Sequence, residues 1–282
     1  MLLSRLALAA LLALGQPVLA QTPATDPAAA VPADRVSEVM RLADLFQVLR
    51  EEGIAYGADL QADMFPAGGG AEWTAEVSGI YDAERLQSAF AAALQAQLSA
   101  QPEAQKAVID FFASDLGQKI VGLEIEARRA FLDTATEEAA RVAAEDAAAA
   151  REPKVALVRQ MIEAGDLLEM NVAGALSGSL AFMTGMSESG AYGAIPQDQL
   201  LSDVWGQEDQ VRADTSTWLN AYLGLAYHPL TEAELQSYVE FSESDAGQRL
   251  NAALFSAFDQ VFRQVSLDLG RAAGRAMQGR DI

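Results

Sequence analysis

The side chains in this sequence that could carry out acid–base or metal chemistry are forty acidic residues and a single histidine, His228. There is no cysteine, so a thiolate nucleophile, a disulfide and a thiolate metal site are all excluded. One histidine also excludes metal sites built from several imidazoles. A Ser-His-Asp triad would have to use His228, and no Gly-x-Ser-x-Gly turn is present to hold the serine. We therefore interpret His228 as a structural residue at a helix end, directly before Pro229.

Acid pairs are frequent because the chain is so acidic. Glu124 with Glu126, and Glu243 with Asp245, are the pairs that could be assigned to catalysis. Residues two apart do not face each other on a helix, so we interpret these carboxylates as solvated. We expect no catalytic residue, cofactor or metal site. Hydrolysis of a cell-wall polymer, which needs only two placed carboxyl groups, remains the alternative.

One pattern of aromatic, serine, acid, glycine, glutamine and cation occurs twice, and its spacing is typical of a bend between two helices. Ser114 or Asp115 can accept from the free N–H groups of a new helix, and Gln118 follows Asp115 as a capping-box partner would. A glycine inside a helix costs about 1 kcal/mol relative to alanine, so we expect a closely packed neighbour there. The residues of the two copies are Phe111, Ser114, Asp115, Gly117, Gln118 and Lys119, and then Phe241, Ser244, Asp245, Gly247, Gln248 and Arg249.

Apolar residues recur at spacings of three and four along most of the chain after residue 33, which predicts an all-α fold. A first helix is expected over 34–52 and should be weakened or ended by Gly53 and Gly57. A long helix is expected from Leu116 through the alanine-rich stretch to residue 151, with a fresh start at Pro153.

Local signals predict two helix starts and one irregular segment. Asp82 should cap a helix, and Thr231 with Glu234 should form a capping box. The glycine-rich stretch 178–193 is interpreted as a loop between helices, with a mobile apolar flap as the alternative.

The two motif copies are separated by 130 residues, and apolar positions after the motif repeat at the same offset. Before the motif the offset becomes 132, which places Trp73 on Trp205 and Asp82 on Asp214. We interpret the chain as two tandem, bundle-like helical repeats, 34–152 and 153–282. Whether the two halves pack together or are loosely linked stays open.

The motif resembles that of an exported bacterial helical family known as domain of unknown function 2059, whose members carry an aromatic, a serine and Gly-Gln-Lys at this spacing. Asp115 and Asp245 stand where many members have proline, and Ser242 stands where an aromatic is usual. The resemblance implies an all-helical envelope protein and carries no known activity.

The start of the sequence predicts export. Residues 1–20 combine Arg5, an apolar stretch and a small-residue cleavage site after Ala20, which indicates a signal peptide. Residues 21–33 are expected to be a disordered tether, and we expect the mature chain in the periplasm. The net charge of −21 argues against nucleic-acid binding. We expect no membrane span in the mature chain.

These features favour a non-catalytic binding or interaction module of the envelope, whose partner is an unknown protein or an apolar ligand; a purely structural role is a further alternative. Trp205, Trp218, Tyr222 and Tyr227 are the candidates for an interaction surface at the junction of the halves, because tryptophan and tyrosine suit half-buried surfaces. The same rings could instead fill the core of the second half. The identity of the partner and the oligomeric state stay open.

Overall fold

The computed structural model describes residues 34–66, 69–191 and 196–279, and all the regular secondary structure within these ranges is helical. The predicted all-α fold is confirmed for this part of the chain. The predicted signal peptide and tether lie outside the described residues. The helices are α1 (Asp34–Val39), α2 (Leu42–Met64), α3 (Gly70–Ile80), α4 (Ala83–Leu98), α5 (Pro102–Phe112), α6 (Asp115–Ala130), α7 (Thr134–Ala150), α8 (Pro153–Ala164), α9 (Leu167–Ser189), α10 (Gln197–Trp205), α11 (Glu208–Tyr227), α12 (Glu232–Glu243) and α13 (Asp245–Met277).

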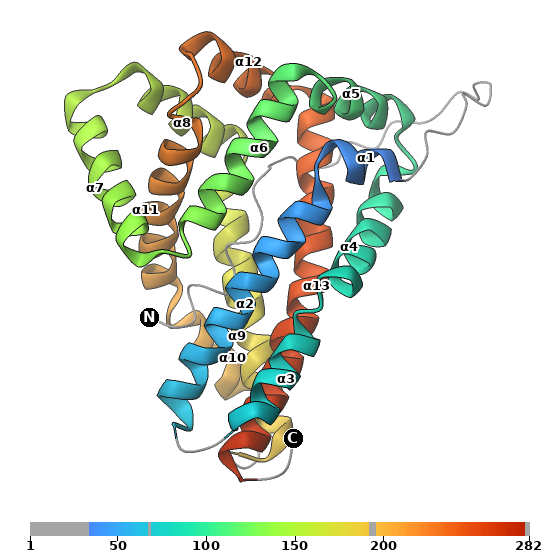
Figure 1. The fold of residues 1–282 in the computed structure, drawn as a ribbon, viewed down its shortest axis with the longest axis vertical. Coiled ribbons are helices and arrows are strands. Elements are labelled where there is room, and N and C mark those ends of the chain that lie inside the picture. Colours follow the sequence, from blue (N-terminus) through green and yellow to red (C-terminus); the bar gives the residue numbers. More distant parts are fainter. Residues whose placement is uncertain (1–33, 67–68, 192–195, 280–282) are drawn as a thin grey trace.

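Helix α13 runs along the long axis of the molecule, from the wide end near α5 and α12 to the narrow end near α3 and the C-terminus (Figure 1). It packs along α9 and also against α4 and α5, which belong to the first half of the chain. Helix α11 likewise packs against both α6 and α7. Helices of the second half therefore pack directly against helices of the first half.

One large apolar core joins the two halves. Phe258 of α13 packs against both Phe46 of α2 and Phe90 of α4, with ring centroids 6.4 and 4.4 Å away. All three rings are buried. Burying a phenylalanine side chain stabilises a fold by about 1.5–3 kcal/mol, so such contacts hold the halves together. A smaller cluster between α9, α10 and α11 lies apart from this core.

Helix α2 continues past Gly53 and Gly57, which were expected to weaken or end it. A Cβ at Gly53 would overlap the ring of Tyr81, and one at Gly57 would lie 2.7 Å from a methyl carbon of Val77. The expectation was wrong because tertiary packing fills the space that these glycines leave. The cost of glycine in a helix is offset by close contact with α3 and the residue after it.

The stretch 178–193 was expected to be a loop, and its first part is instead the body of helix α9. A Cβ at Gly185 would overlap the backbone carbonyl of Leu267, and one at Gly270 would overlap that of Phe182. The glycines allow α9 and α13 to approach closely along parallel courses. Gly190, with φ of 82°, is the residue that ends α9.

Helix boundaries elsewhere follow local signals. Asp82 accepts from the backbone N–H of Arg85, and Thr231 forms the expected capping box with Glu234. Pro153 begins α8, as predicted. The predicted long helix is broken, because α6 ends before Asp133, which caps the separate helix α7.

None of the helices in the described residues combines the length and the apolar character that crossing a membrane requires.

Candidate functional site

The repeated motif forms a tight turn between two helices. The Ser114 hydroxyl donates to the carbonyl oxygen of Phe111 at 2.6 Å and accepts from the backbone N–H of Gly117 at 3.0 Å. A Cβ at Gly117 would overlap the Phe111 carbonyl oxygen and would lie 2.6 Å from the Cα of Phe112. The expected close neighbour of this glycine is confirmed, and it is backbone of the preceding helix.

The second copy has the same local geometry. Ser244 donates to the carbonyl of Phe241 at 2.6 Å and accepts from Gly247 at 3.1 Å. A Cβ at Gly247 would overlap the carbonyl of Phe241. Of the two caps considered for the first copy, the structure uses the serine. Asp115 and Asp245 lie in the first turns of α6 and α13, where a negative charge suits the helix dipole.

The sequence predicted that the motif glutamine would complete a capping box, and this prediction was wrong. Gln118 donates instead to the carbonyls of Phe112 and Val39, at 2.6 and 2.7 Å. Gln248 is placed in the same way, 3.5 Å from the carbonyls of Ser242 and Ala164. Each glutamine therefore ties the turn to the last residue of a helix that lies far away in sequence, α1 or α8.

The two motif copies contact each other. The rings of Phe111 and Phe241 stack with their centroids 4.0 Å apart. Lys119 of the first copy pairs with Glu234 at the start of α12, at 2.7 Å. Arg249 of the second copy donates to Gln101 at the start of α5, at 2.8 Å, and pairs with Asp245. The motif residues thus serve the joint between the halves.

Of the four aromatic residues proposed for an interaction surface, three pack together at the junction and Trp205 lies apart from them. Tyr222 and Tyr227 are buried against α6, and half-buried Trp218 stacks on Tyr222 and meets Phe131 edge-on. These three rings fill the junction and do not form one exposed surface. Trp205 is different, because it is 50% exposed at the end of α10.

The junction encloses a carboxylate that sequence reasoning had interpreted as solvated. The Oε1 atom of Glu124 accepts from the hydroxyls of Tyr227 and Tyr238, at 2.7 and 3.1 Å. Tyr222 donates to the backbone carbonyl of Glu124 at 2.8 Å. The interpretation of Glu124 was wrong because its burial depends on α11 and α12, which are about a hundred residues away in sequence.

Burial raises the pKa of Glu124 to about 7, although the two tyrosine hydrogen bonds act in the opposite direction. The residue keeps some accessible surface, while its carboxylate is surrounded by protein atoms. Burial likewise raises the pKa of the Tyr227 and Tyr238 hydroxyls, so both remain donors. Arg128, which lines the same cavity as Glu124, pairs with Glu52 at 2.7 Å.

A carboxyl group with a pKa near 7 could act as a general acid, so its access to substrate matters. Glu124 and Arg128 line a cavity of about 60 Å³ whose other walls are mostly apolar. This space suits one or two water molecules and is too small for a sugar ring. The other candidate acids, Glu126, Glu243 and Asp245, are exposed, as expected. The geometry does not favour hydrolysis of a polymer at Glu124.

His228 lies exposed at the C-terminal end of α11. Its backbone carbonyl accepts from Lys154 at 2.6 Å. Within the described residues no three histidine or acidic side chains lie close enough to hold a metal ion.

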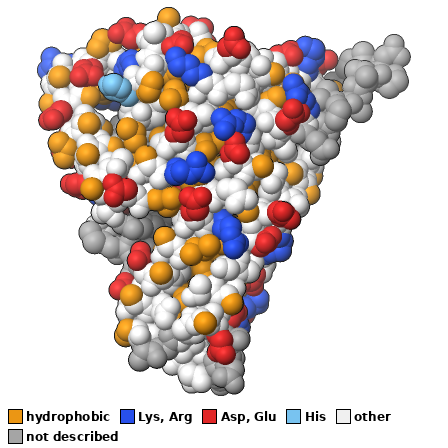
Figure 2. All heavy atoms as spheres, viewed as in Figure 1, with side chains coloured by type: hydrophobic (Ala, Val, Ile, Leu, Met, Phe, Trp, Pro, Cys, Tyr) orange, Lys and Arg blue, Asp and Glu red, His pale blue; other side chains and the backbone are white. Residues whose placement is uncertain are grey.

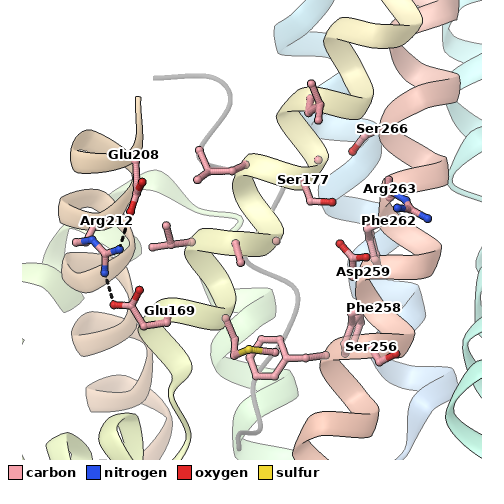
Figure 3. A pocket seen from close by; sticks show the side chains of 18 of the residues that line it. Glu169, Ser177, Glu208, Arg212, Ser256, Phe258, Asp259, Phe262, Arg263 and Ser266 are labelled. Carbon is pink, nitrogen blue, oxygen red and sulfur yellow. Dashed lines mark hydrogen bonds and ion pairs between the residues drawn. The ribbon is translucent and has the colours of Figure 1, made fainter. Parts of the chain in front are cut away.

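A half-open trough of about 700 Å³ runs along α9, with α13 on one side and the α10–α11 corner on the other (Figure 3). We call it the α9 trough. Trp205 lies at its α10 end, and Ser177 and Ser266 point toward each other between α9 and α13. Its lining residues are Glu169, Met170, Val172, Ala173, Gly174, Leu176, Ser177, Gly178, Leu180, Trp205, Glu208, Arg212, Ala252, Phe255, Ser256, Phe258, Asp259, Phe262, Arg263 and Ser266.

Charged groups occur only at the borders of the α9 trough. On the α11 side, Arg212 pairs with Glu169 and with Glu208. On the α13 side, Asp259 points toward α9, whereas the guanidinium of Arg263 points away from it (Figure 3). The sequence had pointed only to Trp205 and to the start of the glycine-rich stretch 178–193, because the rest of this surface depends on α9 being a helix.

The class that these observations define is an all-helical protein with two tight helix–helix turns and an open apolar trough. Residues 84–146 match the model of a family described as an uncharacterised protein conserved in bacteria (DUF2059). These residues form a DUF2059 domain, which spans most of α4–α7 and contains the first motif copy. No curated protein and no solved structure matches the chain. Membership of the second copy in the same family stays a prediction.

The packing of the motif glycine gives the first testable prediction. We expect Gly117→Ala to lower the free energy of unfolding by about 1–3 kcal/mol, because the new methyl group overlaps backbone that cannot move freely. Gly79→Ala is the matched control: Gly79 is an exposed helical glycine with open space at its Cβ position, so we expect a gain of about 0.5–1 kcal/mol. Urea denaturation measures both, and equal stabilities for Gly117→Ala and the wild type would contradict the packing role.

The second prediction concerns Glu124. A folded-state pKa raised above the unfolded value means that the group's stabilising contribution is complete below about pH 4.5 and is lost as the pH rises through about 7. Glu124→Gln keeps an acceptor for both tyrosines without the charge. We therefore expect the variant and wild type to be similar at pH 5, and the variant to be more stable at pH 8 by at most about 3 kcal/mol. Glu126→Gln, an exposed neighbour, is the control.

Denaturation at pH 5, 6, 7 and 8 checks this expectation. If the stability curves of wild type and Glu124→Gln run parallel over the whole range, Glu124 does not titrate in this window.

Proposed function

We propose that this protein is a non-catalytic binding protein of the bacterial envelope that receives the apolar face of another protein, or an apolar ligand, in the α9 trough. The observation that carries the proposal is a half-open, largely uncharged hollow of about 700 Å³, with a half-exposed tryptophan at one end. Ligand sites are typically concave, mostly apolar and of this size. Exposed tryptophan is also common where proteins recognise partners.

The composition of α9 supports this assignment. Helices α2 and α9 have the same length, 23 residues, and each follows a short connection from the preceding helix. Helix α2 carries charged residues along its whole length, whereas α9 has none between Met170 and Ser187. Ala173 on this uncharged stretch is exposed, and Leu180 is half-buried. The chain is strongly acidic, with a net charge of −21, so an uncharged apolar surface open to water stands out. Exposed apolar surfaces of this kind mark binding sites.

The exported location is part of the proposal. It rests on the signal-peptide pattern of residues 1–20, with residues 21–33 as a tether. The family match to an uncharacterised bacterial protein is compatible with it.

We also infer that the two halves, 34–152 and 153–282, are copies of one unit. The reciprocal contacts of the motif cations and the equivalent roles of Gln118 and Gln248 support this. The left-handed residues Arg41 and Asp166 give further support, because each lies two residues after a helix end that a motif glutamine contacts. In this scheme the copies share the joint, and the second copy has developed the binding surface.

The alternative, a hydrolase with a carboxylate pair, has less support. Glu124 has the raised pKa that such chemistry would use, but its cavity of about 60 Å³ has no room for a polymer.

Binding of a neutral apolar dye tests the proposal. We expect Nile red to bind the full chain with an increase in fluorescence, and Ala173→Lys to weaken that binding at least tenfold by placing an ammonium group on the trough floor. Ala173 is exposed on a helix, so the substitution leaves the core intact. Ala143→Lys, at an exposed position on α7, is the control. Equal dye binding by the two variants would place any apolar site elsewhere.

A further inference from the structure

We propose that the natural occupant of the α9 trough is a basic amphipathic helix of another protein, with an apolar stripe bordered on both sides by Lys or Arg. This inference rests on the proposed function, because it names the class of ligand that the same surface takes. Three features of the trough support it: its openness, the size of the residues on its floor, and the charges along its two borders.

The trough is open along one side, so it would leave much of a small ligand in water. Small-molecule sites normally bury most of the ligand surface. A helix needs only one face covered, and its polar outer face stays solvated. The lining runs over residues 169–180 of α9 and 252–266 of α13. At 1.5 Å per residue these stretches are about 18–22 Å long, which corresponds to three or four turns of a bound helix.

The floor of the trough would let the backbone of a bound helix approach α9 closely. Ala173, Gly174 and Ser177 follow one face of α9, and none carries a side chain larger than a hydroxymethyl group. Small residues at a contact allow two helix axes to approach toward the short end of the usual 8–10 Å range. Phe262 and Leu180, both half-buried, provide larger apolar contacts beside this floor.

The borders select a basic partner. Glu169 and Glu208 share one cation, Arg212, so this side keeps one net negative charge. On the other side, Asp259 is exposed and points toward α9. Its neighbour Arg263 is directed away from the trough. A helix in the trough would therefore meet one net negative charge on the α11 flank and, on the α13 flank, the Asp259 carboxylate, which lies nearer to α9 than the Arg263 guanidinium does.

The net charge of the whole chain acts in the same direction. At −21, a second copy or an acidic partner would be repelled, whereas a basic helix would be attracted from a distance. The face shown in Figure 2 carries interspersed acidic and basic side chains, so the attraction is not concentrated on that face.

The test uses three synthetic peptides of equal length and the full chain. One has a Leu/Ala stripe flanked by lysines, the second has the same stripe flanked by glutamates, and the third has the composition of the first in an order that forms no stripe. Titration at physiological salt keeps long-range charge effects small. We expect the Lys-flanked stripe to bind at least tenfold more tightly than either of the other peptides.

Two matched variants locate the contact. Asp259→Lys should weaken binding of the Lys-flanked peptide about tenfold, since it replaces an attraction by a repulsion. Asp146→Lys changes the net charge equally on α7, which does not line the trough, and should leave binding nearly unchanged. If both variants weaken peptide binding equally, the net charge of the protein alone explains the loss, and the proposal is overturned.

The other occupants appear as distinct outcomes. Palmitate is titrated in parallel: if palmitate binds, Ala173→Lys abolishes that binding and no peptide binds, then the trough takes a lipid chain and only the partner assignment fails. If none of palmitate, Nile red and the peptides binds, both the basic-helix proposal and the proposed function fail. If the chain alone sediments as a dimer that Ala173→Lys dissociates, the occupant is a second copy and the basic helix is excluded.

Discussion

Each half of the molecule depends on a helix whose third residue has no side chain. The backbone carbonyl six residues earlier lies where a Cβ of Gly117 or Gly247 would be, so only glycine lets the preceding helix turn so sharply. The serine before each helix fixes this turn by satisfying both a free N–H and a free carbonyl. The angle between the helices then brings Phe111 and Phe241 into a stacked contact. The joint between the halves follows from this local constraint.

The junction between α6 of the first half and α11 and α12 of the second is filled by side chains. Three tyrosine hydroxyls from α11 and α12 are directed at Glu124 of α6, two at its carboxylate and one at its carbonyl. The rings that bring these hydroxyls there fill the space between the halves, so no partner can reach them. The amphipathic character of tyrosine is used inside the molecule, with the ring in the core and the hydroxyl on a buried acceptor. The uncharged stretch of α9, with half-exposed Trp205 beside it, is not covered in this way and is the surface that we propose for recognition.

Local sequence signals predicted the helical fold, the caps at Asp82 and Thr231, the start of α8 at Pro153 and the crowding of the motif glycines. They failed where distant packing decides the outcome. Gly53, Gly57 and Gly185 were read as helix breakers because their tertiary partners were unknown, and Tyr81, Val77 and α13 fill the space beside them. The proposed duplication could have corrected one error, since it makes the helix α2 the counterpart of α9.

The candidate sites were harder to predict than the fold. The Glu124 carboxylate differs from that of the solvated Glu126 in accepting hydrogen bonds from tyrosines in the other half of the chain. The α9 trough could not be predicted while α9 itself was interpreted as a loop. Trp205 was identified for its amphipathic ring, although the structure separates it from the other three aromatics that were grouped with it.

The central claim is that recognition takes place on α9. Backbone hydrogen exchange of the full chain, with and without the Lys-flanked peptide at saturation, tests it most directly because it reports on every helix at once. Added protection should be confined to residues 169–180, 205–212 and 252–266, which line the trough. The joint at 111–119 and 241–249 should be unchanged. Protection centred on that joint, or spread evenly over the chain, would contradict the account.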